Sequence, residues 1–217
     1  MAVTIPVYCV DIGSVAEGNF AWSGLGVGDQ PTEDDSMSGL AEMVAADLTA
    51  EQPVALGFEC PLFVPIRERP EDLTSGRAGE GNRAWSAGAG CGALATGLVQ
   101  VVWLLREIRR LVGARPAFLD WEAFMRSGSG LFVWEAFVSG KAKRGGHLED
   151  ARAALHAFRR AVAQPTVVSA ITCGEETYSL IGAALLRSGW STDVAILRSP
   201  CIVVRADGGA GQPGGWA

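Results

Sequence analysis

The 217-residue sequence lacks the short motifs that identify several large enzyme classes. It has no Gly-x-Ser-x-Gly segment, so it offers no nucleophile elbow for a serine hydrolase. It has no Gly-Lys-Ser/Thr segment, and its glycine-rich run at residues 86–92 is not a Gly-x-Gly-x-x-Gly turn after a first strand. P-loop and dinucleotide binding are therefore not expected.

The few cysteines show no spacing typical of a metal site or of a disulfide framework. There are five, an odd number, and no two stand in a Cys-x-x-Cys arrangement. They are Cys9, Cys60, Cys91, Cys173 and Cys201. We expect reduced thiols in a cytoplasmic protein and no structural zinc site.

Positive charge and long apolar runs are also scarce. Lys and Arg number 18 against 24 Asp and Glu, the net charge is -6 and the pI is near 5.0. This balance argues against a basic protein that coats nucleic acid, although a site built of carboxylates is acidic until it binds metal. The N-terminus has no basic or cleavable apolar segment, and the most apolar stretch, residues 98–105, runs into Arg106, Arg109 and Arg110. We therefore expect a cytoplasmic protein without a membrane span.

Apolar runs of strand length alternate with helical patterns along the chain. The expected strands are residues 7–12, 19–25, 53–58 and 131–138, with further candidates at 116–121 and 194–204. The expected helices are residues 36–48, a long helix that ends at 112, and residues 147–162 and 178–186. This alternation predicts a single α/β domain over residues 1–207, followed by a flexible glycine-rich tail at 208–217.

Four acidic residues occupy positions that suggest a metal site. Asp11 and Glu59 each end an apolar strand, and Glu135 lies inside another. Asp150 is in the first turn of a predicted helix that begins at His147. A carboxylate is costly to bury without a counter-charge, and several together are the ligands that Mg²⁺ or Mn²⁺ prefers. Asp11, Glu59 and Asp150 are therefore predicted as metal ligands. Glu135 and His147 are predicted to assist them in catalysis.

These acids also have ordinary structural explanations. Asp11 could cap the turn that follows it. Glu59 could pair with Arg67 or Arg83. Glu135, on an alternating strand, could simply face solvent.

The order of the acids resembles that of a known nuclease superfamily. The segments are Val-Asp11-Ile-Gly-Ser, Gly-Phe-Glu59-Cys-Pro-Leu, Trp-Glu135-Ala-Phe and His147-Leu-Glu-Asp150-Ala. The series resembles that of the RNase H-like superfamily, in which an Asp on the first strand faces an acid on the fourth strand and a helix adds the remaining acid. It is most similar to a poorly characterised group of predicted nucleases with this fold, over roughly residues 7–190. The resemblance implies a mixed sheet flanked by helices and hydrolysis of DNA or RNA.

The last acid of the series stays open. The terminal segment of the predicted nucleases resembles Glu175-Glu176-Thr-Tyr-Ser179, which puts Ser179 where they carry a metal ligand. A hydroxyl cannot replace the charge of a carboxylate. The site would then be weakened, or Asp150 would take over from another helix, although a first-turn acid is also a common surface feature. The three-strand meander of the superfamily would be truncated, because no third strand is evident between Leu25 and Ser36.

Two groups of residues are candidates for contact with nucleic acid. Lys141, Lys143 and Arg144 form a basic segment before the acid-bearing helix and could meet phosphates, unless they are merely a solvated loop. Arg83 and Trp85 could supply a cation and a stacking ring, although such a tryptophan is more often core.

The sequence thus predicts a divalent-metal-dependent nuclease, a hydrolase that binds nucleic acid. The alternative is a non-catalytic RNase H-like module that acts by binding, which the acidic pI and the serine at position 179 favour. An actin-like phosphotransfer relative is a third hypothesis, based on the Asp-Ile-Gly-Ser turn, but that architecture needs two such domains. The choice between DNA and RNA and the formation of a homodimer are left open.

Overall fold

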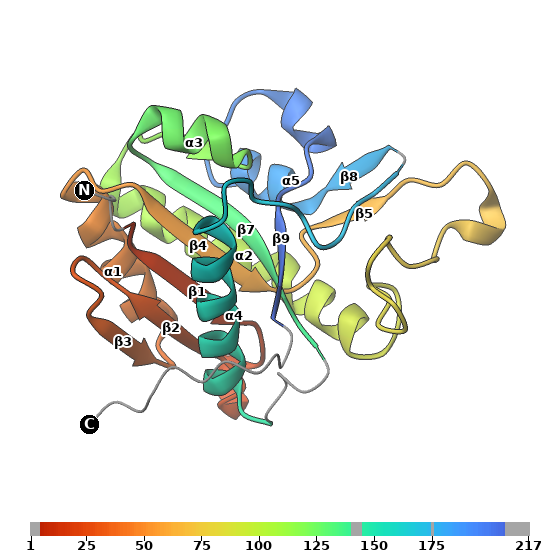
Figure 1. Ribbon diagram of the computed structural model, residues 1–217, viewed down its shortest axis with the longest axis horizontal. Helices are drawn as coiled ribbons and strands as arrows, with labels where there is room; N and C mark the ends of the chain where they lie inside the picture. The colour runs from red at the N-terminus through yellow and green to blue at the C-terminus, as the bar shows by residue number, and fades with distance from the viewer. Residues whose placement is uncertain (1–4, 140–144, 175, 207–217) are drawn as a thin grey trace.

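The protein is built around one mixed β-sheet, seen at the centre of Figure 1. The computed structural model describes residues 5–139, 145–174 and 176–206, and the tail predicted at 208–217 lies outside these ranges. The seven-stranded sheet has the order β3-β2-β1-β4-β7-β6, and β9 also pairs with β7. Its strands are β1 (Val7–Asp11), β2 (Ala21–Leu25), β3 (Pro31–Asp34), β4 (Val54–Glu59), β6 (Ala117–Phe118), β7 (Leu131–Val138) and β9 (Val203–Ala206). The predicted α/β class with a mixed sheet is confirmed.

The first three strands form an antiparallel meander, and the remaining strands run parallel to β1. β1 pairs antiparallel with β2, and β2 with β3. β4 is parallel to β1 and β7, and β7 is parallel to β6 and β9. The expectation of no strand between Leu25 and Ser36 is wrong, because β3 forms there. Its residues are mostly exposed and polar, as suits an edge strand, so no apolar alternation marks it in the sequence.

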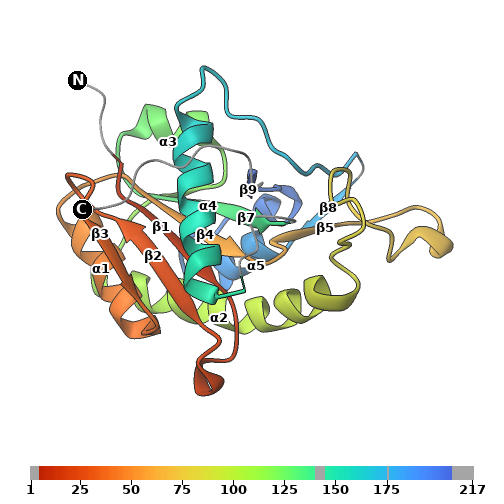
Figure 2. The ribbon, with the colours of Figure 1, turned by 60° about the horizontal axis from the view of Figure 1, so that its bottom comes forward.

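Helices cover both faces of the sheet. α1 (Met37–Thr49) and α2 (Gly88–Val112) lie behind it in Figure 1, and α5 (Leu180–Arg187) packs against α2. α4 (His147–Val162) crosses the opposite face in front of β1 and β4, as Figure 2 also shows. α3 (Trp121–Ser127) contributes to the core on the α4 side.

Strand residues alternate between these two layers. Tyr8 and Val10 of β1 belong to the core beneath α1 and α2, whereas Val7 and Cys9 belong to the core beneath α4. Because the side-chain period of a strand is two, Asp11 continues the second set. The last residue of β1 is therefore directed toward α4.

Two elements near the end of the chain differ from the prediction. Tyr178 does not begin a helix, because it lies in β8 (Thr177–Ser179), which pairs with β5 (Phe63–Pro65) in a separate two-stranded sheet. The strand expected at 194–204 is a 3₁₀ helix at Val194–Arg198 followed by β9. Strands of three residues are too short to show an alternation in the sequence.

α2 is long and apolar enough to cross a membrane by its length and composition. One such helix is weak evidence, because the core helix of a soluble protein, which is mostly buried, passes the same test; in α2, 22 % of the apolar window is buried. Leu104, Leu105 and Ile108 of α2 are fully buried in the core, and Arg109 and Arg110 lie in its last turn. Apart from this helix, the arrangement of the sheet and its covering helices is mostly a soluble-like α/β fold.

Candidate metal centre

Three carboxylates from distant parts of the chain meet at one edge of the sheet. Asp11 ends β1 and Glu59 ends β4, and the two are register partners in neighbouring parallel strands. Register partners in parallel strands point to the same face, so both side chains are directed toward α4. Asp150 lies in the first turn of α4, which crosses this face. One ligand atom from each of the three lies within 4.8 Å of those of the other two.

This group fits a divalent cation that prefers oxygen ligands. Asp11 is 5 % exposed, Asp150 is 2 % exposed and Glu59 is half-buried. Hard cations hold carboxylate oxygens at roughly 2.0–2.6 Å, so two ligands of one ion lie at most about 5 Å apart. The separation of 4.8 Å is within that limit. Across the part of the chain that the structure describes, it is the only group of three or more acidic, histidine or cysteine side chains gathered this closely.

His147 begins α4 and contacts one of the carboxylates, that of Asp11. Its Nδ1 lies 2.5 Å from Oδ2 of Asp11. His147 and Asp150 are one helical turn apart, so they lie on the same side of α4. The His147 side chain is 42 % exposed, so the ring is open to solvent while one of its nitrogens is held. The structure therefore brings His147 together with the three predicted ligands.

Glu135 does not join this cluster. It pairs in register with Phe58, one residue before Glu59 in β4. Because successive strand residues point to opposite faces, Glu135 is directed away from Asp11 and Glu59. It is 1 % exposed, and its two oxygens accept hydrogen bonds from Arg77 at 2.6 and 2.8 Å. Glu135, predicted as an assisting catalytic acid, is thus a member of a buried ion pair with Arg77.

Arg77 binds two buried glutamates at once, and we call Arg77, Glu80 and Glu135 the ion cluster. Nε of Arg77 donates to Oε1 of Glu80 at 2.8 Å, and Nη1 also donates to the carbonyl oxygen of Phe63 at 3.1 Å. The backbone N–H of Leu62 donates to Glu135 at 2.8 Å. Burial raises the pKa of Glu135, an effect that the Arg77 guanidinium opposes. Burial alone would lower the pKa of Arg77, but the two glutamates hold it above its ordinary value.

Sequence reasoning missed Arg77 and Glu80. Both are 3 % exposed, although they lie in a long connecting segment where loop residues are usually solvated. The only signal in the sequence is their spacing of opposite charges three residues apart, which is common and unspecific. Their burial depends on the distant partner in β7.

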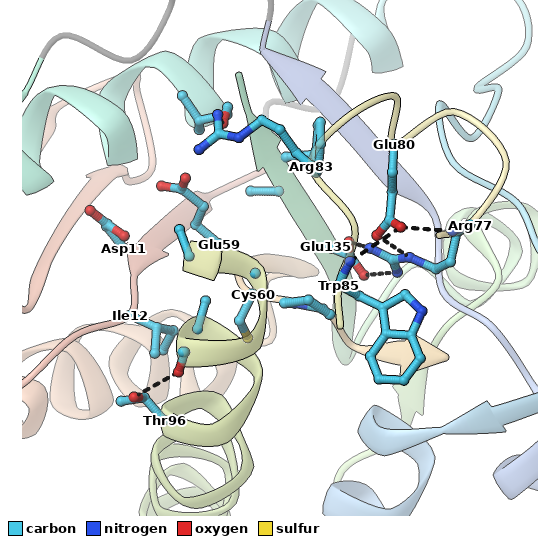
Figure 3. Close-up of a pocket in the computed structure, with 18 of the residues that line it drawn as sticks. Asp11, Ile12, Glu59, Cys60, Arg77, Glu80, Arg83, Trp85, Thr96 and Glu135 are labelled. Carbon is cyan, nitrogen blue, oxygen red and sulfur yellow. Dashed lines mark hydrogen bonds and ion pairs between the residues drawn. The ribbon is translucent and has the colours of Figure 1, made fainter. Parts of the chain in front are cut away.

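Asp11, Glu59 and His147 line a cleft of about 330 Å³. Arg83 and Trp85, which were predicted to contact substrate, line the same cleft. Figure 3 shows the two acids and the Arg83 guanidinium on one side of the view, and Trp85 beside the ion cluster on the other. The volume is within the range of small-ligand sites. A cation and an aromatic ring therefore border the space in front of the carboxylates.

Both of these predicted substrate contacts are also anchored. Nη1 of Arg83 donates to the carbonyl oxygen of Val138 at 3.1 Å, and the indole N–H of Trp85 donates to that of Ser75 at 3.0 Å. Each anchor limits the rotation of its side chain at the border of the cleft. Outside the described residues lie the other predicted contacts, Lys141, Lys143 and Arg144.

Of the two candidates for the last acid, the structure brings Asp150 to the cluster. Ser179 is fully buried at the start of α5, where its hydroxyl accepts a hydrogen bond from the backbone N–H of Gly182 at 3.0 Å. This is the usual role of serine at the beginning of a helix. Ser179 therefore has a structural explanation that needs no metal.

Small residues at the start of α2 let this helix lie close to its neighbours. A Cβ at Gly90 would lie 2.6 Å from the carbonyl oxygen of Ala84, and a Cβ at Gly97 would lie 2.6 Å from Sγ of Cys60. Gly90 belongs to the glycine-rich run at residues 86–92, in which a Cβ at Gly88 or Gly92 would meet nothing within 4 Å. The close neighbour of Gly90 is the backbone of the loop that precedes α2, so within this run the close approach is to that loop and not to another helix.

Comparison of the chain with protein-family models, with curated proteins and with solved structures finds no match. The assignment of a function therefore depends on the strand order, the carboxylate cluster and the cleft.

Proposed function

We propose that this protein is a cytoplasmic, divalent-metal-dependent nuclease of the RNase H-like kind, which hydrolyses phosphodiester bonds of a nucleic acid. The observation that carries the proposal is the meeting of Asp11, Glu59 and Asp150 from β1, β4 and α4. In the superfamily that the sequence resembles, an Asp on the first strand faces an acid on the fourth, and a helix adds another. An antiparallel meander followed by β4 beside β1 supports the same assignment.

Asp11, Glu59 and Asp150 would hold the cation, Mg²⁺ or Mn²⁺. When bound, such a cation supplies Lewis-acid stabilisation of the negative charge that develops on a phosphodiester. Burial of two of the three carboxylates limits their motion, so little reorganisation is needed when a ligand binds. The net negative charge of the chain is compatible with this chemistry, because the bound cation would neutralise the carboxylates of the site.

His147 is suited to move a proton at the edge of this site. If Nδ1 carries the ring proton and donates a hydrogen bond to Asp11, Nε2 is the nitrogen with a free lone pair. The side chain lines the cleft, so Nε2 can accept a proton from an attacking water there. Arg83 offers a positive charge to a phosphate, and Trp85 offers a ring to a base.

The first test is a thermal melt with and without Mn²⁺. At about 100 times its Kd, a ligand stabilises the folded state by about 2.7 kcal/mol. For a chain of this size that corresponds to a rise of roughly 5–10 °C in Tm. Glu59→Gln and Asp11→Asn should each lose this rise and also lose Mn²⁺-dependent cleavage of labelled DNA and RNA. Glu122→Gln, which changes an exposed acid of α3, is the control and should keep both.

Retained cleavage in Glu59→Gln and Asp11→Asn would refute the assignment of these residues. A wild-type protein that Mn²⁺ does not stabilise would refute the nuclease proposal itself. That second result would favour the non-catalytic binding module instead.

A further inference from the structure

The ion cluster is a costly way to fill the interior of this protein. Arg77, Glu80 and Glu135 are 3 %, 3 % and 1 % exposed. Desolvation of such groups offsets most of their attraction, and apolar residues of similar volume often stabilise a fold equally well. Buried ions can add a fixed geometry, because their hydrogen bonds are satisfied together in only one arrangement. The contacts of the cluster identify the segment whose geometry is fixed.

Glu80 holds both ends of the segment that carries Arg83 and Trp85. Its Oε2 accepts hydrogen bonds from the backbone N–H of Arg77 at 2.7 Å and from that of Trp85 at 3.3 Å. The backbone N–H of Arg83 donates to the carbonyl oxygen of Glu80 at 3.2 Å. Residues 77–85 are therefore folded around one carboxylate.

Glu135 fixes the same segment to the sheet. Arg77 joins Glu80 to Glu135, which lies in β7, beside the strand that ends in the carboxylate cluster. Arg83 donates to the carbonyl oxygen of Val138, farther along β7. These contacts with β7 thus fix where the Arg83 guanidinium and the Trp85 ring lie relative to the carboxylates. Figure 3 shows the labelled residues in this arrangement.

We propose that the ion cluster positions Arg83 and Trp85 at the cleft for a single-stranded nucleic acid, and that Glu135 is a positioning residue and not a metal ligand. This inference rests on the proposed nuclease function and names its substrate class. Arg83 supplies a charge for a phosphate. The ring of Trp85 can stack only on a base whose face is free, which an unpaired strand offers and a stacked duplex does not.

The decisive variant neutralises the whole cluster, by Arg77→Met, Glu80→Gln and Glu135→Gln together. It leaves no buried ion without a counter-charge, so it should fold, whereas a single replacement could unfold the chain. Tyr8→Phe is the matched control. It removes a hydrogen bond from Tyr8 to Asp47 of 2.7 Å, between β1 and α1, from residues that do not line the cleft.

Binding is measured by fluorescence anisotropy with labelled DNA and RNA strands of about 16 nucleotides, the upper end of common single-strand site sizes. The buffer contains Ca²⁺, which takes carboxylate ligands as Mg²⁺ does, and gels verify that the strands stay intact. Trp85→Ala should weaken binding about tenfold, because stacking contributes to each contacted base. The neutral triple variant should weaken it by at least this factor, because it displaces Arg83 together with Trp85. All four substitutions together should weaken it no further than the triple variant does, since the Trp85 contact is already lost there.

The Mn²⁺-induced rise in Tm should persist in all these variants, and Tyr8→Phe should change neither measurement. Two results would overturn the inference and leave the nuclease proposal intact. The triple variant could bind as tightly as wild type, or the fold-losses in affinity of Trp85→Ala and of the triple variant could multiply in the combined variant. Loss of the Mn²⁺ effect in the triple variant would also overturn it, because Glu135 would then belong to the metal site. A wild type that Mn²⁺ does not stabilise overturns the nuclease proposal, and this inference with it.

Discussion

Replacing Arg77 alone with methionine should destabilise the protein strongly, although it changes no residue of the proposed metal centre. The guanidinium bonds to Glu135 at 2.6 and 2.8 Å, to Glu80 at 2.8 Å and to the carbonyl oxygen of Phe63 at 3.1 Å. In Arg77→Met both glutamates stay buried without their counter-charge. Removing one partner of a buried ion pair costs about 3–5 kcal/mol, and we expect a loss in this range in the free energy of unfolding.

The loss should also depend on pH. Burial raises the folded-state pKa of Glu135, and Arg77 opposes that rise. An acid with a raised pKa contributes stability at low pH that is lost as the pH rises through its folded-state value. Without Arg77 the pKa of Glu135 rises further, so Arg77→Met should lose more stability at pH 8 than at pH 5.

Urea unfolding followed by circular dichroism at both pH values measures this difference. Arg126→Met, which removes an exposed ion pair with Glu122, is the control and should cost less than about 1 kcal/mol. A loss below about 1 kcal/mol for Arg77→Met, or an equal loss at pH 5 and pH 8, would refute the reasoning.

Three further outcomes are expected. Gly57→Ala should lower stability by about 1–3 kcal/mol in urea unfolding, because a Cβ there would lie 2.3 Å from the Trp134 ring; an unchanged midpoint would contradict this packing. Ser179→Ala should cost about 0.5–2 kcal/mol as a lost helix cap, yet keep the full Mn²⁺ shift in Tm; a lost shift would place Ser179 at the metal centre. The hydrogen bond from Arg152 lowers the pKa of Glu33, so its contribution is present at neutral pH and lost as the pH falls below about 4. The stability gap between wild type and Glu33→Gln should therefore shrink in acid, and a gap that grows would contradict the assignment.

The carboxylate cluster was largely predictable from the sequence because its residues stand at strand and helix ends. Asp11 and Glu59 end two apolar strands, and carboxyl ends of parallel strands meet at one edge of a sheet. Asp150 and His147 begin a helix whose apolar face is clear in the sequence and whose observed bounds match the prediction. The sequence left open whether Asp150 or Ser179 stands at the third position of the cluster.

The position of Glu135 could not be predicted, because it depends on the register between two strands. A shift of one residue in the pairing of β4 and β7 would turn Glu135 to the opposite face. The apolar runs of these strands are buried on both faces, so their sequences carry no alternation from which the facing could be read. Arg77 and Glu80 were missed for a related reason, since only their partner in β7 accounts for their burial.

The three carboxylates lie far apart along the chain, which has a consequence for protein synthesis. A ribosome completes β1 and β4, with Asp11 and Glu59, well before it reaches Asp150. A nascent or prematurely ended chain without α4 holds only two of the three ligands. On the proposed function, such a chain lacks a complete active site. Hydrolysis of nucleic acid near the ribosome can therefore begin only after α4 has docked on the sheet.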